Sequence, residues 1–154
     1  NIRVYGTFVF GYGESGPEDY LAAAEFAIEH SFYIAAFNHL TPFPGTPLYK
    51  RLQDEGRLIY DQWWLDPRYR YNDLPFRPES GEPDDVRLGC LAARRKFYGW
   101  PSILRRFADP LNRGESVLAR NFLPINYMHR AELGQRDGFP LGDPEWRGEL
   151  LEVA

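Results

Sequence analysis

The chain has 154 residues, a length typical of one domain or of one domain with an appendage. A hydrophobic content of 44% excludes a disordered chain, and a net charge of −4 gives no overall electrostatic reason to expect a nucleic-acid partner. Cys90 is the only cysteine, which excludes an intrachain disulfide and a cysteine-based metal cluster held by this chain alone.

The ends and the hydropathy of the chain suggest where it belongs. No apolar run approaches the roughly 20 residues of a membrane span, and no signal peptide precedes the first strand pattern. With a single cysteine, this predicts a cytoplasmic protein. The chain begins at Asn1 without an initiator methionine and continues directly into an apolar strand pattern, so we expect it to be a piece of a longer protein.

The first forty residues predict a strand, a helix and a second strand. Residues 2–10, IRVYGTFVF, are apolar and rich in β-branched and aromatic types, which is typical of a strand buried on both faces. A glycine-rich turn then leads into a helix with Ser15 or Gly16 as cap and Pro17 near its first position. Residues 32–40, FYIAAFNHL, predict the second strand.

A strand, a helix and a strand this close in sequence predict a βαβ unit with parallel strands. The turn GYGESGP and the corner TPFPGTP would then leave the sheet at the same edge, where α/β folds place their sites. Gly6, Gly11 and Gly13 do not form a dinucleotide-binding fingerprint, because their spacing differs from G-x-G-x-x-G. Gly6 lies inside the strand, which indicates close approach of another group.

The rest of the chain predicts helices separated by long loops, and the composition changes near Tyr60. The expected elements are a helix capped by Thr46 and ended by Gly56, a long aromatic loop, a helix over 83–98, a short helix around 103–107, and a helical region over 115–133 that Pro124 bends or breaks. A loop as long as the aromatic one is often functional. We read its aromatic residues first as packing and second as a ligand lid.

Several side chains admit both a structural and a functional interpretation. Glu14 precedes a helix and could cap it or bind a ligand, and His39 is more simply a hydrogen-bonding residue than a metal ligand. His129 is most simply a surface residue. The basic runs 94–96 and 105–106 are most simply a solvated helix face.

Two segments, at the correct separation, resemble the C-terminal part of a radical SAM domain of the kind that carries a cobalamin-binding domain ahead of its barrel. In GTFVFGYGESGPEDY the matching residues are Gly6, Phe8, Gly11, Gly13, Glu14 and Ser15. In NHLTPFPGTPLYKRLQDEGRL they are Pro42, Pro44, Gly45, Thr46, Pro47, Leu48 and Tyr49. The pair is more specific than either segment alone, and the resemblance covers about residues 1–60.

The resemblance implies an α/β fold in which residues 1–59 are the C-terminal βαβ portion of a radical SAM (β/α) barrel and residues 60–154 are a mostly helical extension. Such enzymes use a 4Fe–4S cluster to cleave S-adenosylmethionine and start radical chemistry. Their late strands help to hold the adenosine part. This implies cofactor-binding roles at the strand ends for Phe8, Gly11, Glu14, Asn38, Leu40 and Pro42, with Phe8 or Leu40 flanking the adenine.

The sequence departs from this family in its cysteines. The C-x-x-x-C-x-x-C loop that holds the cluster is absent, and Cys90 cannot replace it. We therefore expect the chain alone to bind no cluster and to be inactive, with the cluster and a cobalamin-binding domain supplied by the missing part of a parent enzyme. The resemblance implies a small-molecule substrate of lipid or tetrapyrrole-like type. The open edges of barrel strands predict a homodimer or strand pairing of the isolated piece.

Two other functions remain open on the sequence. Residues 60–110 could form a non-catalytic interaction module that binds a partner protein or large substrate through arginine and aromatic side chains, which are enriched at interface hot spots. A hydrolase or aldolase of the α/β-barrel class is weaker, because Glu14 and His39 are its only candidate catalytic residues and neither has an evident partner.

Overall fold

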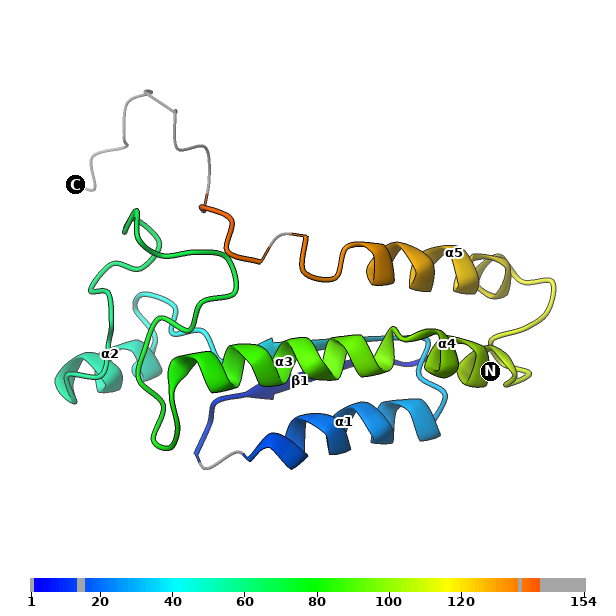
Figure 1. Cartoon of the computed structure of the whole chain (residues 1–154), viewed down its shortest axis with the longest axis horizontal. Coiled ribbons are helices and arrows are strands. Elements are labelled where there is room, and N and C mark those ends of the chain that lie inside the picture. The colour runs from blue at the N-terminus through cyan, green and yellow to red at the C-terminus, as the bar shows by residue number, and fades with distance from the viewer. Residues whose placement is uncertain (1, 14–15, 136, 142–154) are drawn as a thin grey trace, which may run out of the picture.

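The computed structural model describes residues 2–13, 16–135 and 137–141. Within them the chain forms an α/β fold of two strands and five helices (Figure 1). The elements are β1 (Tyr5–Phe10), α1 (Pro17–Glu29), β2 (Ile34–His39), α2 (Pro47–Asp54), α3 (Pro83–Phe97), α4 (Trp100–Phe107) and α5 (Val117–Ala131). The order strand, helix, strand and then helices confirms the α/β class predicted from the sequence.

The two strands are parallel neighbours, as predicted, with Tyr5 opposite Ile34 and Phe10 opposite His39. The crossover helix α1 begins where its cap signals place it. Gly16 is the N-cap residue, its N–H donates to the Asp19 carboxylate at 2.9 Å, and Pro17 is the first helical residue.

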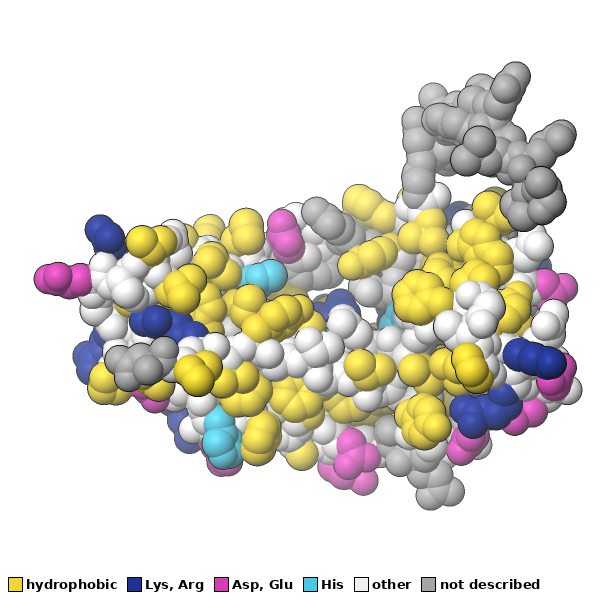
Figure 2. Space-filling view, turned by 180° about the vertical axis from the view of Figure 1, so that it is seen from behind, with side chains coloured by type: hydrophobic (Ala, Val, Ile, Leu, Met, Phe, Trp, Pro, Cys, Tyr) yellow, Lys and Arg dark blue, Asp and Glu magenta, His cyan; other side chains and the backbone are white. Residues whose placement is uncertain are grey.

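Only one face of the sheet is covered by the main core, so the expectation of a strand buried on both faces is wrong for β1. Phe10 is buried against the helices, whereas Tyr5 and Val9 on the other face are 62% and 53% exposed. The reason is that α1 and α3 pack on the same face. Helix α5 lies on the opposite side of the sheet from α1 (Figure 1), and hydrophobic side chains are visible along the rear of the molecule (Figure 2).

The main hydrophobic core joins the βαβ unit to the helical region. Phe37 from β2 and Phe97 from α3 are both fully buried, with ring centroids 5.6 Å apart. The mid-strand glycine is explained here: a Cβ on Gly6 would lie 2.6 Å from the ring of Phe32. The close approach that Gly6 indicated is therefore made by a neighbouring aromatic side chain.

A buried arginine ties the last two helices to the start of β2. Arg106 is fully buried, donates to the carbonyls of Phe32 and Phe97, both at 3.0 Å, and lies 3.7 Å from the centroid of the Phe97 ring. It also donates to Asn126 on α5 at 3.0 Å. Burial lowers the pKa of Arg106 to about 10. The prediction of a solvated helix face is therefore wrong for Arg106. Its N–H groups are used inside the protein, as hydrogen-bond donors to the backbone carbonyls of Phe32 and Phe97.

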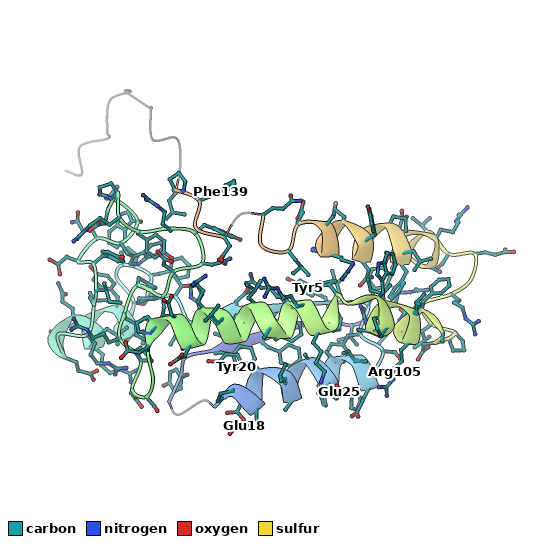
Figure 3. All side chains as sticks on the ribbon, viewed as in Figure 1. Tyr5, Glu18, Tyr20, Glu25, Arg105 and Phe139 are labelled. Atoms are coloured by element: carbon teal, nitrogen blue, oxygen red, sulfur yellow. The ribbon has the colours of Figure 1, made fainter. Side chains whose placement is uncertain are left out.

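The remaining helices follow the sequence closely. Thr46 caps α2 by accepting from the Tyr49 N–H at 3.3 Å, as predicted. Helix α5 continues through Pro124, so the expected break is not found. Outward-facing charges join the helices at some points, as where Glu25 on α1 lies 3.6 Å from Arg105 on α4 (Figure 3). None of the described helices is both long enough and apolar enough to cross a membrane.

Candidate functional site

A small cavity lies at the carboxyl ends of the two strands, and we call it the strand-end cavity. Its volume is about 150 Å³, and Gly11 and Leu40, each of which directly follows a strand, both line it. Leu48 from α2 and Phe76 from the long loop complete an apolar wall. The turn after β1 and the corner after β2 therefore meet at one edge of the sheet, as the parallel pairing predicts.

The geometry of the strand ends explains the glycine at this edge. Gly11 has a φ of +92°, a backbone conformation that residues with a side chain rarely adopt. The next bond of the strand pair, from the Leu40 N–H to the Phe10 carbonyl at 2.7 Å, holds the two loops together. Backbone atoms of both loops therefore form one side of the strand-end cavity.

The rim of the strand-end cavity is charged but balanced. Arg57 lies 2.9 Å from the Glu55 carboxylate and 3.5 Å from that of Glu79. Arg51 stacks over the ring of Tyr12, 5.9 Å from its centroid. An apolar wall with a balanced rim suits an uncharged heterocycle better than a phosphate. The volume is below the roughly 300 Å³ of ordinary ligand pockets, so this cavity alone would hold only part of a ligand.

The other residues assigned to the cofactor from the resemblance lie elsewhere. Phe8 faces the helices and stacks on Phe37, with centroids 5.1 Å apart, instead of lining the strand-end cavity. Its position on the strand decides this, because side chains alternate between the two faces. Pro42 is fully buried, and Asn38 points to a second cavity described below. Glu14 lies outside the described residues.

The long aromatic loop supports the corner after β2. The Trp63 indole N–H donates to the Pro42 carbonyl at 2.9 Å, and the Trp63 ring lies 5.1 Å from that of Tyr69. The Tyr49 hydroxyl donates to the Asp61 carbonyl in the same loop. These contacts give the aromatic residues a packing role beside the strand-end cavity, the first of the two interpretations that the sequence left open.

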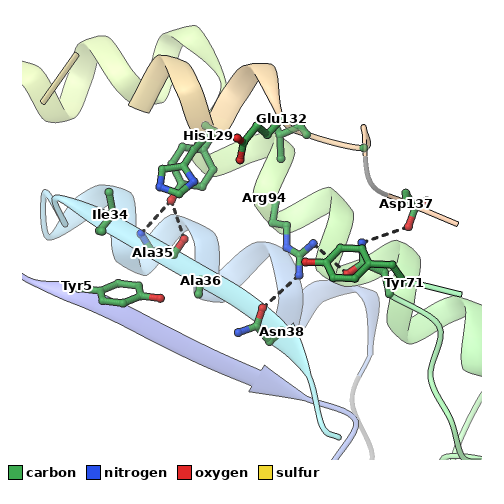
Figure 4. A pocket seen from close by; sticks show the side chains of 14 residues that line it. Tyr5, Ile34, Ala35, Ala36, Asn38, Tyr71, Arg94, His129, Glu132 and Asp137 are labelled. Atoms are coloured by element: carbon green, nitrogen blue, oxygen red, sulfur yellow. Dashed lines mark hydrogen bonds between the residues drawn. The ribbon is translucent and has the colours of Figure 1, made fainter. Parts of the chain in front are cut away.

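A larger cavity lies on the sheet face turned away from α1, and we call it the sheet-face cavity. Its volume is about 280 Å³, and it is visible as a hollow in the middle of the rear face (Figure 2). The polar side chains that line it come from every part of the chain: Tyr5, Asn38, Tyr71, Asn72, Arg94, Tyr98, His129, Glu132 and Asp137 (Figure 4).

Arg94 of α3 and Tyr98, which directly follows this helix, stand at the wall of this cavity and cover the outer edge of β2. The Tyr98 hydroxyl donates to the Ala35 carbonyl at 2.8 Å and accepts from the Ala35 N–H at 3.3 Å. Arg94 donates through Nε to the Phe37 carbonyl at 2.9 Å. Burial raises the pKa of Tyr98, which keeps its hydroxyl protonated. Within the described residues, the outer edge of β2 is thus covered by the side chains of Arg94 and Tyr98 and not by another strand.

Sequence reasoning missed the role of these residues. The sequence predicts a solvated helix face for Arg94 and a surface position for His129, yet both line the sheet-face cavity. His129 stacks on Tyr98, with ring centroids 5.0 Å apart. The available signal was spacing: Arg94 and Tyr98 are four residues apart, on one face of a helix, next to the buried stripe that contains Ala93 and Phe97.

The described residues offer no candidate metal centre. No group of three or more histidine, cysteine or acidic side chains comes together among them. His39 donates from Nδ1 to the Leu40 carbonyl at 3.2 Å, and burial lowers its pKa. Cys90 is buried in the core, and burial raises its pKa to about 11, which makes it a poor thiolate donor at neutral pH.

Comparison with known proteins connects the chain with methyltransferases. It is 27% identical over 112 residues to bacteriochlorophyllide d C-12(1)-methyltransferase from Chlorobaculum tepidum, a match that covers 72% of this chain and 24% of that protein. It is 24% identical over 105 residues to bacteriochlorophyllide d C-8(2)-methyltransferase from the same organism, covering 68% and 23%. Both matches are longer than residues 1–59, so they include part of the helical region.

These relatives are much longer than the chain, which spans about a quarter of the length of each. No protein-family model matches the chain, and no solved structure is significantly similar to it. What the comparisons support is therefore a distant similarity to two methyltransferases over about seven tenths of the chain.

Proposed function

We propose that the chain is the C-terminal part of a radical SAM methyltransferase that acts on a tetrapyrrole-like small molecule, with cobalamin bound by an upstream domain. In this proposal β1, α1 and β2 are the end of the (β/α) barrel. The strand-end cavity is one wall of the site for the adenosine part of S-adenosylmethionine, and α3 of the helical region covers the outer side of the barrel beside α1.

The observation that carries the proposal is the meeting of the two family-like segments at one sheet edge. Gly11 from GYGESGP and Leu40 from NHLTPFPG line the same cavity, at the carboxyl ends of parallel strands. That edge is where α/β folds bind their ligands. The similarity to two methyltransferases supports the reaction class, and the name of their substrate supports a tetrapyrrole.

The described residues fit part of S-adenosylmethionine but not the iron–sulfur cluster. An uncharged adenine suits the apolar wall of Leu40, Leu48 and Phe76. A cluster needs cysteine thiolates, and the single cysteine of the chain is buried in the core. Reconstitution of the 154-residue chain alone with iron and sulfide under anaerobic conditions should therefore give no absorbance near 400 nm, and a brown product would contradict this.

The deciding test is on the full-length protein. Its gene should encode a C-x-x-x-C-x-x-C motif roughly 100–150 residues before Asn1, judged from the size of a barrel. The reconstituted protein should transfer labelled methyl groups from S-adenosylmethionine to a tetrapyrrole acid. Absence of the motif would refute the radical mechanism, and absence of transfer to any tetrapyrrole would refute the reaction.

Two matched substitutions test the place of the cofactor. Leu40→Asn puts a polar amide in the apolar wall and should raise the KM for S-adenosylmethionine by about tenfold or more. Leu65→Asn makes the same change at a loop residue that is 59% exposed and lines no part of the strand-end cavity. Equal kinetics for the two variants would place the adenosine elsewhere.

The interaction-module alternative gains less support. Trp63 packs against the corner after β2, and its indole N–H is used within the chain. Arg94 and Arg106 likewise donate to backbone carbonyls of this chain. Several arginine and aromatic side chains of residues 60–110 therefore have partners within the chain, which account for them without a partner protein.

A further inference from the structure

We propose that the sheet-face cavity binds a carboxylate of the substrate and that Arg94 holds this carboxylate. The inference rests on the proposed function for the kind of substrate. The anion-binding role of Arg94 rests on the geometry of the cavity alone.

The Arg94 guanidinium is fixed in place by neutral partners. Nε donates to the Phe37 carbonyl at 2.9 Å, one terminal nitrogen donates to Asn38 Oδ1 at 3.2 Å, and the other to Asn72 Oδ1 at 3.5 Å. These bonds use three of the five N–H groups of the side chain. Two N–H groups, one on each terminal nitrogen, remain for a ligand, and the orientation of the fork is already set before a ligand arrives.

No described residue balances the Arg94 charge by an ion pair. Asp137, at the same cavity, is paired with Arg87 at 2.8 Å, and no carboxylate of the described residues lies within ion-pair distance of Arg94. A half-buried guanidinium that meets only backbone and amide oxygens gains most from an anion that reaches it. The neutral partners orient the guanidinium and leave its charge for the ligand.

The other charges of the cavity favour a singly charged anion. Glu132, on the α5 side, is exposed and carries a negative charge, and it faces the cavity from the opposite wall to Arg94 (Figure 4). A phosphate dianion would leave excess negative charge beside Glu132 and Asp137. A carboxylate adds only one negative charge beside these acids and matches the planar fork of the guanidinium in geometry.

The walls indicate what the carboxylate is attached to. Tyr5 and Tyr71 border the cavity and are 62% and 41% exposed, and the stacked pair of Tyr98 and His129 lies between β2 and α5. A cavity of about 280 Å³ open to solvent takes one arm of a larger molecule and leaves the rest against these rings. We therefore assign the ligand as a flat conjugated acid, bound through one acidic arm.

The test uses the purified chain with a chlorin that carries one carboxylate, pyropheophorbide a, and its methyl ester as the uncharged match. Chlorin fluorescence anisotropy in the same low concentration of non-ionic detergent gives both dissociation constants. The acid should bind about tenfold or more tightly than the ester, and this preference should shrink in high salt.

Variants of two neighbouring arginines distinguish binding at Arg94 from non-specific electrostatic attraction to the positive charge of the helix. Arg94→Met should bind acid and ester alike, whereas Arg95→Met, the same change at an exposed residue of the same helix, should keep the preference. Arg94→Lys keeps the charge without the fork, and its preference should fall between the two. Circular dichroism checks that each variant is folded. If Arg94→Met does not fold, Arg94→Lys is the deciding variant, and an acid preference equal to that of the unaltered chain would contradict the role of the Arg94 fork.

The remaining outcomes overturn the proposal. Equal binding of acid and ester by the unaltered chain, no binding of either, or an acid preference that survives in Arg94→Met would each refute a carboxylate site at Arg94. The result is separable from the proposed function. If the cavity prefers the acid but the gene lacks the cluster motif, the carboxylate site stands and the radical mechanism is refuted. If the full-length protein transfers methyl groups but the cavity shows no preference for the acid, the proposed function stands and the carboxylate site is refuted.

Discussion

Replacing Tyr98 by phenylalanine removes a single hydroxyl and tests how the outer edge of β2 is stabilised. That hydroxyl donates to the Ala35 carbonyl at 2.8 Å and accepts from the Ala35 N–H at 3.3 Å. Both residues are buried, with 4% of each exposed. No other described strand pairs with this edge, because the sheet consists of β1 and β2 only.

The cost follows from the two backbone groups that lose their partner. Each buried group left without a hydrogen bond costs about 1–3 kcal/mol. The N–H bond is long, and water in the adjoining sheet-face cavity can partly replace the hydroxyl, so the expected loss lies toward the lower end. We expect the free energy of unfolding to fall by about 1.5–3 kcal/mol, which corresponds to a decrease in Tm of roughly 3–12 °C for a domain of this size.

Urea unfolding followed by circular dichroism at pH 7 measures this loss. The matched control is Tyr127→Phe, because that tyrosine is 58% exposed and its free energy of unfolding should change by less than about 0.5 kcal/mol. Hydrogen exchange adds a local readout, since the Ala35 amide should lose protection in the Tyr98 variant first. If Tyr98→Phe unfolds within 0.5 kcal/mol of the unaltered chain, the edge is not held by this hydroxyl and the reasoning fails.

Two further predictions concern the core. Gly6→Ala should lower the free energy of unfolding by about 1–3 kcal/mol, because its Cβ would lie 2.6 Å from the Phe32 ring; thermal unfolding measures this, and an unchanged Tm would mean that the ring moves aside freely. Stability should also fall as the pH rises from 9 to 12, because burial raises the pKa of Tyr20 and Tyr69 to about 12 from 10.0 and that of Cys90 to about 11 from 9.0. The unfolded chain loses these protons first, so a urea midpoint that is constant or rising from pH 8 to pH 11 would contradict the assignment.

Local sequence signals predicted the helices well because each carries its own start and stop chemistry. Thr46 and Gly16 cap α2 and α1 where the sequence places them, and proline follows each cap. The parallel sheet was also predictable, since the short connection allows few other topologies. The exception is Pro124, which α5 accommodates without ending. A proline removes one hydrogen bond of a helix, and α5 continues because its apolar face is held elsewhere, as where its fully buried Phe122 packs on Tyr33 and Phe107.

The candidate site was only half predictable. The strand-end cavity follows from topology, because parallel strands bring their carboxyl ends together, and the sequence therefore located Gly11 and Leu40. The side-chain direction of Phe8 depends on the register, which the sequence leaves open by one residue. The sheet-face cavity was not predictable, because it is formed by Arg94 and His129 from helices whose docking on the sheet only the three-dimensional structure gives.

The two edges of the sheet differ in a way that bears on the rest of the protein. On the outer edge of β2, the backbone groups of Ala35 and Phe37 are already bonded to Tyr98 and Arg94. The free edge of β1 pairs with no strand of the described chain. A further strand, from an upstream segment or from a second copy of the chain, can therefore extend the sheet only beside β1.

The position of the free edge beside β1 determines how the two cavities would lie in the proposed barrel. Under the proposed function, the preceding barrel strands would lie beside β1, and the face that carries Tyr5 and Asn38 would turn toward the interior of the barrel. The strand-end cavity would then open at the top of this interior, and the sheet-face cavity along its wall below the α5 segment. Cofactor and substrate would thus lie at the end and along one face of the same two strands, with Leu40 near the first and Arg94 near the second. Substitutions at these two residues should accordingly affect different kinetic parameters: Leu40→Asn the KM for S-adenosylmethionine, and Arg94→Met the KM for the acid.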